Sequence, residues 1–200
     1  MIMKQTALKI GATAIAMVLV IAGISAWKHF TKADVVNTLT VEQATELAAA
    51  PVNNLKAGNA TFRVKVQGDS ALTADGVVDW AGEQGIITMR KTGEGDQEWF
   101  WTGTKLYGKF FGQNNWQRVE SSGASEDLLW VIATLSSMQA SKPQDTDSVR
   151  SAGFEPAGTL RDLTLYKNGA TTFGVTSEGT LGYHVQPSPS SGVVFYFELS

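Results

Sequence analysis

Alternating apolar and polar residues predict most of the secondary structure of this chain. In residues 60–67, Ala60, Phe62, Val64 and Val66 alternate with polar side chains, as in a strand with one buried face. Similar strands are predicted at residues 72–80, 85–91, 98–102, 105–111, 116–119, 159–167, 170–176, 181–185 and 193–199. Because short glycine-rich turns separate the strands before residue 120, we predict an antiparallel meander there.

Two stretches carry the start and stop signals of helices. Thr40 is placed as the N-cap of a first helix, which we expect Pro51 to end. Ser125 is placed as the N-cap of a second, which Pro143 follows. Residues 128–132 are apolar on every side of that helix, so we expect it to be covered on two sides. These elements predict one α+β domain over residues 34–200, with about ten strands and two or three helices on one face.

The N-terminal segment is predicted to enter a membrane. Residues 10–27 form a run of 18 residues without a charge, flanked by Lys9 and Lys28. As a helix this run would be about 27 Å long, which is close to the thickness of a bilayer core. We therefore expect residues 1–33 to be a membrane anchor, with the remaining domain outside the cytoplasm, in the cell envelope. Because Gly23, Ser25 and Ala26 resemble a signal-peptidase site, secretion after cleavage is the alternative.

Composition removes several classes of function. The chain has no cysteine, only two histidines and a net charge of −3, which disfavours disulfide scaffolds, metal sites and nucleic-acid partners. Ser70 lies in a Gly-Asp-Ser-Ala-Leu stretch like that of the GDSL hydrolases, but the sequence has no Asp-x-x-His to activate it. We therefore expect no enzyme activity, no cofactor and no metal. His184 is interpreted as an ordinary strand residue.

Aromatic residues crowd into the first block of strands and the helix after it. The simplest interpretation is an ordinary core that is rich in aromatic side chains. A sharper one is a sheet that curves around an apolar cavity, which the all-apolar helix partly closes. The predicted lining is Phe62, Val64, Val66, Ile87, Met89, Trp99 and Trp101 of the strands and Leu128, Trp130 and Ile132 of the helix, with Trp80 joining from the opposite phase.

The order of these motifs resembles a known family. The sequence has Ala74-Asp75-Gly76-x-Val78, then Leu106-Tyr107, then Trp116-x-x-Val119. This order is similar to that of the LppX/LprAFG family of actinobacterial envelope lipoproteins, which are related in fold to the LolA lipoprotein carriers. The resemblance implies a strongly curved antiparallel half-barrel, with helices over its concave face and an apolar cavity for acylated lipids. The chain departs from the family because it lacks the lipid-modified cysteine, and its apolar N-terminal segment takes that place.

Two functions follow from the sequence. The leading hypothesis is a membrane-associated protein that binds the acyl chain of a lipid or lipoglycan in an apolar cavity. The alternative is a membrane-anchored interaction or sensor domain with a filled core and no lipid ligand. A contiguous apolar void in the domain would distinguish the first from the second.

Overall fold

The structure is a computed structural model that describes residues 39–67, 72–109, 112–188 and 193–200. The strands in these ranges are β1 (Asn59–Gln67), β2 (Leu72–Asp79), β3 (Gln84–Lys91), β4 (Gln97–Thr102), β5 (Lys105–Lys109), β6 (Gln117–Val119), β7 (Glu155–Leu160), β8 (Leu163–Asn168), β9 (Thr171–Val175), β10 (Leu181–Pro187) and β11 (Val194–Leu199). The helices are α2 (Val41–Ala57), the short 3-10 helix η1 (Ser121–Gly123), α3 (Glu126–Ser137) and α4 (Thr146–Ser151).

The strands in these ranges form one open antiparallel sheet of eleven strands, in the order β6-β5-β4-β3-β2-β1-β11-β10-β9-β8-β7. Each of the two blocks, β1 to β6 and β7 to β11, is a meander. Pairing of β1 with β11 joins the blocks in the middle of the sheet, where Val64 lies opposite Phe197. The large antiparallel sheet predicted from the sequence is therefore confirmed.

The strand register sorts the side chains onto two faces. Val64 lies opposite Phe197 on one side and Ala74 on the other, and Ala74 lies opposite Met89. Because directly opposed residues of an antiparallel pair point to the same side, these residues share one face, which we call the inner face. On the other, outer face, Val77 and Ile86 are about half exposed, at 47% and 50%.

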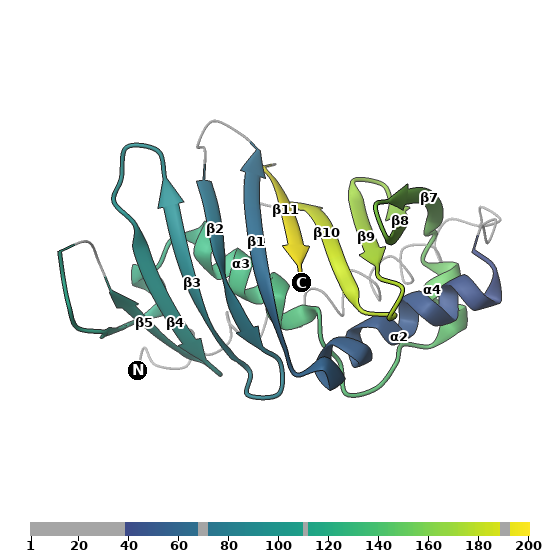
Figure 1. Cartoon of the computed structure of the whole chain (residues 1–200), viewed down its shortest axis with the longest axis horizontal. Coiled ribbons are helices and arrows are strands. Elements are labelled where there is room, and N and C mark those ends of the chain that lie inside the picture. The colour runs from purple at the N-terminus through teal and green to yellow at the C-terminus, as the bar shows by residue number, and fades with distance from the viewer. Residues whose placement is uncertain (1–38, 68–71, 110–111, 189–192) are drawn as a thin grey trace, which may run out of the picture.

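Helices cover the inner face in two parts. Figure 1 shows α3 crossing behind β1 and β2, while α2 runs along the other end of the sheet near β9 and β10. Hydrogen bonds fix α2 and α4 there: Tyr166 of β8 donates to Glu46 of α2, and Asn168 donates to the carbonyl of Ala152, which caps α4. The buried apolar residues of both parts form one core.

The prediction that Pro51 ends the first helix is wrong, because α2 continues to Ala57. Proline removes one helical hydrogen bond, at a cost of about 3 kcal/mol. Tertiary contacts compensate: the amide of Ala140 donates to the Pro51 carbonyl at 3.1 Å, and Asn54 in the next turn is buried. Thr40 caps the helix as predicted, in a reciprocal capping box with Gln43.

Two further regions differ from the sequence predictions. The single strand expected at residues 159–167 is part of a hairpin, because the chain turns between β7 and β8 at Arg161, which adopts a positive φ of 56°. The polar stretch after Pro143 contains α4, whose N-cap Asp145 accepts hydrogen bonds from the amide and the hydroxyl of Ser148. A helix of six residues carries too short a pattern to be recognised from hydrophobic periodicity.

The predicted membrane segment, residues 10–27, and Ser70 lie outside the described residues. No helix within the described ranges is both long and apolar enough to cross a membrane.

Candidate functional site

The strand residues predicted to line a cavity come together on the inner face. Register pairs place Phe62 and Val64 of β1 in line with Ile87 and Met89 of β3, and these in line with β4. Val66 follows Val64 in the same phase of β1, opposite Phe195 of β11. Trp99 lies opposite Ile87, and Trp101 lies opposite Gly85. We call the side chains between this part of the sheet and α3 the apolar layer.

Trp80 belongs to the same phase as this set and not to the opposite phase predicted from the sequence. It follows Val78 by two residues, and Leu72, Ala74 and Val78 are the buried residues of β2. Trp80 itself is buried just beyond the end of that strand.

The helix side of the apolar layer follows the period of an α-helix. Leu128, Val131 and Leu135 are fully buried and lie three to four residues apart, so they form one stripe along α3. Trp130 and Ile132, which the sequence analysis grouped with Leu128, are only partly buried and pack at the edges of the core. A spacing of two residues defines one face of a strand but not of a helix.

The apolar layer is closely packed in this structure. Val64, Ile87 and Leu128 are 0% exposed, so no water-sized void borders them. Glycines on the inner face make room for aromatic rings. A Cβ on Gly85 would stand 2.2 Å from the indole of Trp101, and one on Gly76 would stand 2.8 Å from the ring of Phe62. The volume beside each glycine is therefore already filled.

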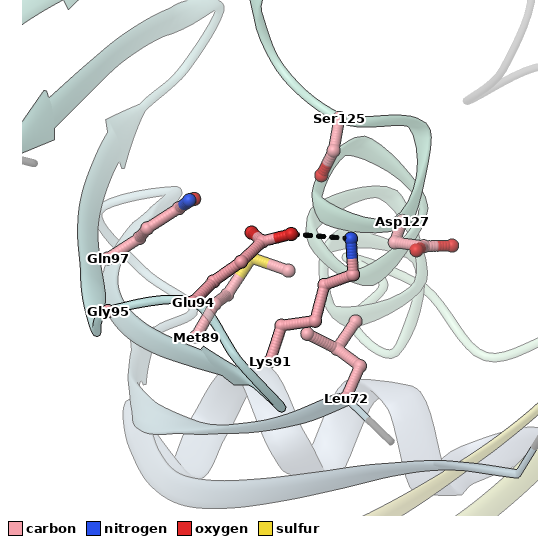
Figure 2. Close-up of a pocket in the computed structure, with 8 residues that line it drawn as sticks. All are labelled: Leu72, Met89, Lys91, Glu94, Gly95, Gln97, Ser125 and Asp127. Carbon is pink, nitrogen blue, oxygen red and sulfur yellow. Dashed lines mark hydrogen bonds and ion pairs between the residues drawn. The ribbon is translucent and has the colours of Figure 1, made fainter. Parts of the chain in front are cut away.

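A cavity of about 110 Å³ lies at the end of the apolar layer, where α3 begins. Figure 2 shows α3 and its N-cap on one side, and β3, β4 and the turn between them on the other. Apolar Leu72 and Met89 line it together with the polar rim residues Lys91, Glu94, Gln97, Ser125 and Asp127, and with Gly95. Of the residues predicted to line a lipid cavity, only Met89 lines this one. Because an apolar cavity of roughly 150 Å³ holds one benzene molecule, this cavity is too small for an acyl chain.

The rim of the cavity carries one cation between two acids. Lys91 Nζ donates to Glu94 Oε1 at 2.7 Å, and both side chains are about half exposed. The hydrogen bond and charge of Glu94 raise the pKa of Lys91, and the charge of Asp127 adds to this. Lys91 therefore stays protonated, and its positive charge is paired with the carboxylate of Glu94. The rim residues named above offer no unpaired positive charge to an anionic group.

Two buried polar atoms of α3 find no hydrogen-bond partner among the described residues. They are Nε1 of Trp130 and Oγ1 of Thr134. Thr134 is 0% exposed, on a helix face that otherwise buries apolar side chains. Unsatisfied buried polar groups of this kind are uncommon, because each costs about 1–3 kcal/mol.

The two ends of α3 are held differently. After its last turn, Asn54 Nδ2 donates to the Met138 carbonyl at 2.8 Å, and the amides of Ala140 and Gln144 donate to carbonyls of α2. Within the described part of the chain, the hydrogen bonds of residues 120–128 stay in that segment and the first turn of α3. The C-terminal end of α3 is therefore fixed to α2, whereas its N-terminal end borders the cavity.

His184 lies on the inner face away from this site, as a buried residue of β10. Its ring stacks on Phe173 with 4.4 Å between centroids, and its two nitrogens contact the Thr172 carbonyl and Gln186 Oε1. Burial lowers the pKa of His184 to about 4, although both hydrogen bonds raise it. This environment agrees with the prediction of an ordinary strand residue. The described residues contain no group of three His, Asp or Glu side chains that could hold a metal.

Sequence reasoning did not find the polar rim. A glycine-rich turn between the strands at 85–91 and 98–102 and the helix cap at Ser125 were each predicted, but nothing in the local sequence indicates that they lie side by side. Phe195 and Phe197 were also missed as parts of the inner face. Their strand carries Val194 and Tyr196 in the opposite phase, so apolarity alone does not decide which phase is buried.

Comparisons with known proteins find a likeness to solved structures but not to known sequences. No protein-family model matches the sequence, and none of the curated proteins is similar to it in sequence. A LolA superfamily protein from Nitrosomonas europaea is similar in its crystal structure. The likeness covers 81% of this chain and 92% of that chain, with 12% identity and a TM-score of 0.33. It assigns no ligand to this chain, and membership of the LppX/LprAFG family stays a prediction.

Proposed function

We propose that the protein is a non-enzymatic component of the cell envelope that binds the acyl chain of a lipid between α3 and the inner face of the sheet. The observation that supports this proposal is the apolar layer. It extends from β1 to β4 under a single helix, and it ends at a cavity with an apolar floor and a polar rim. Relative to water, burial of each CH₂ group of a chain there contributes about 0.8 kcal/mol.

Residues 10–27 are proposed to anchor the protein in the cytoplasmic membrane, with the domain outside. This part of the proposal comes from the uncharged run in the sequence. The anchor would hold the domain within reach of the lipids that it binds. Cleavage of the same segment would release the domain, which is the alternative for its location.

Binding requires α3 to move, because the apolar layer is filled without a ligand. The hydrogen bonds of Asn54, Ala140 and Gln144 hold the C-terminal end of the helix against α2. We propose that the N-terminal end lifts away from β3 and β4 and that the acyl chain enters through the cavity there. The sheet would then take the form of an open half-barrel around the chain, as the family resemblance implies.

The rim charges favour a lipid without a strongly anionic head group. Glu94 already neutralises Lys91, and Asp127 lies on the opposite side of the cavity. Among these three side chains the acids outnumber the cation, so a phosphate monoester or a free carboxylate would meet net repulsion. A neutral or zwitterionic lipid would meet none.

A reversible crosslink across the cavity tests this mechanism. The chain has no cysteine, so Gln97→Cys with Asp127→Cys supplies a unique thiol pair, with one thiol on each side of the cavity. We expect a reducible bifunctional crosslinker to prevent uptake of a fluorescent acyl lipid, and reduction of the same sample to restore it. Equal uptake in both states would refute entry at the N-terminal end of α3.

The packing of the apolar layer favours a second candidate, a membrane-anchored interaction or sensor domain with a filled core. The outer face offers such a domain a contact surface, because Val77, Ile86 and Trp116 are each more than 40% exposed. Phe100 lies on the same face, because it is opposite Ile86 in the register, and its ring centroid is 6.4 Å from that of Trp116. In that case the reduced protein would also take up no lipid.

A further inference from the structure

We infer that Trp130 Nε1 and Thr134 Oγ1 form a binding site for the ester carbonyl oxygen of the bound acyl chain. This inference rests on the proposed function, because it requires a ligand in the apolar layer. It adds the chemical class of the ligand, which is an acyl ester and not a plain hydrocarbon chain or a free fatty acid.

The two residues are neighbours on one helix. Trp130 and Thr134 are four residues apart on α3, so they are neighbours on its surface, with about 5–6 Å between their Cβ atoms. Both polar atoms are buried, and neither has a partner among the described residues. A threonine in a helix commonly donates to the carbonyl four residues earlier, but Thr134 does not donate to Trp130 in this way.

The chemistry of the two groups selects an acceptor. The indole N–H of Trp130 can only donate, and the hydroxyl of Thr134 can donate as well. A carbonyl oxygen has two lone pairs, so it can accept from both at once. Without such an oxygen, each group is buried with no hydrogen bond to compensate for its loss of water. An apolar side chain in the same place would carry no such desolvation cost.

An ester fits this site better than a carboxylate. The buried polar and charged residues in the described ranges are Asn54, Thr134, His184 and Ser188. None of them is a lysine or an arginine, and burial keeps His184 neutral. A buried carboxylate would therefore lack a compensating charge, whereas a neutral ester carbonyl needs only hydrogen bonds.

The test uses the full chain in nanodiscs of a dialkyl ether phosphatidylcholine, which contains no ester carbonyl. The probe is methyl palmitate with an isotope-labelled carbonyl, followed by infrared spectroscopy, and hexadecane serves as the probe without a carbonyl. We expect the protein to lower the carbonyl stretching frequency. Thr134→Val and Trp130→Phe should each remove part of this shift and weaken methyl palmitate binding about two- to tenfold. They should weaken hexadecane binding much less than methyl palmitate binding.

Matched controls separate this role from general packing. Thr73→Val and Trp116→Phe make the same chemical changes on exposed residues and should leave both probes unaffected. Thr134→Ser returns the hydroxyl and should restore the shift. If methyl palmitate and hexadecane bind equally well and the variants change neither, the carbonyl site is refuted while lipid binding stands. If neither probe binds the unchanged protein, the proposed function fails together with this inference.

Discussion

Replacement of Asn54 by alanine is predicted to weaken the attachment of α2 to two other elements of the fold. The Asn54 side chain is 3% exposed and makes two hydrogen bonds to the backbone. Its Nδ2 donates to the Met138 carbonyl at 2.8 Å, and its Oδ1 accepts from the Leu181 amide at 2.9 Å. One side chain therefore links α2 to the end of α3 and to β10.

The expected cost follows from what alanine leaves behind. The Met138 carbonyl and the Leu181 amide would both stay buried without a partner, and each such group costs about 1–3 kcal/mol. The free energy of unfolding should therefore fall by about 2–6 kcal/mol. In a chain of this size, that loss corresponds to a decrease in Tm of roughly 5–20 °C.

The neighbouring asparagine provides a matched control. Asn53 makes one part-buried hydrogen bond, from Nδ2 to the Gly179 carbonyl at 2.9 Å, so Asn53→Ala should cost only about 0.5–1.5 kcal/mol. Urea unfolding of the full chain in mild detergent, followed by circular dichroism, would measure both variants. If Asn54→Ala destabilises the protein no more than Asn53→Ala does, the assigned role of Asn54 is wrong.

Three other changes test the packing and the titration of the core. Gly85→Ala should lower the urea midpoint by the equivalent of about 1–3 kcal/mol, because the new Cβ would collide with Trp101, and an unchanged midpoint would contradict that packing. Val64→Trp should cost about 1–3 kcal/mol or more in the filled layer, whereas Thr73→Trp on the outer face should cost little; equal effects would argue against a filled layer. Because burial lowers the pKa of His184 from 6.5 to about 4, its contribution to stability is complete above about pH 6.5 and is lost as the pH falls toward 4. His184→Phe should therefore remove about 3 kcal/mol of this pH dependence in urea titrations, and an unchanged pH profile would exclude His184 as its source.

Strands such as β1 could be predicted because they have one solvent-exposed face and one buried face. Arg63 and Lys65 are exposed while Phe62 and Val64 are buried, which is the pattern that the sequence displays. The pairing that joins the two meanders could not be predicted from the alternation of apolar and polar residues. Pairing of β1 with β11 brings residue 64 next to residue 197, and no turn or spacing in the sequence marks that contact.

The residues that share the inner face were predicted better for the strands than for the helix. The alternating sets of β1, β3 and β4 reach the same face because the register aligns them, a fact that only pairing determines. On α3 the buried stripe is Leu128, Val131 and Leu135, and a spacing of two residues could not find it. The unsatisfied hydroxyl of Thr134 depends on the packing around it, so the sequence carries no signal of it.

The most direct test of acyl-chain binding between α3 and the sheet is photocrosslinking of the full chain to a neutral phospholipid that carries a diazirine on one acyl chain. The experiment would use membrane vesicles that contain the protein, and mass spectrometry would map the labelled residues. We expect labels in the apolar layer, on residues such as Ile87, Met89, Leu128 and Val131, and we expect the crosslink between positions 97 and 127 to abolish them. Labels confined to residues 10–27 or to the outer face would contradict acyl-chain binding between α3 and the sheet.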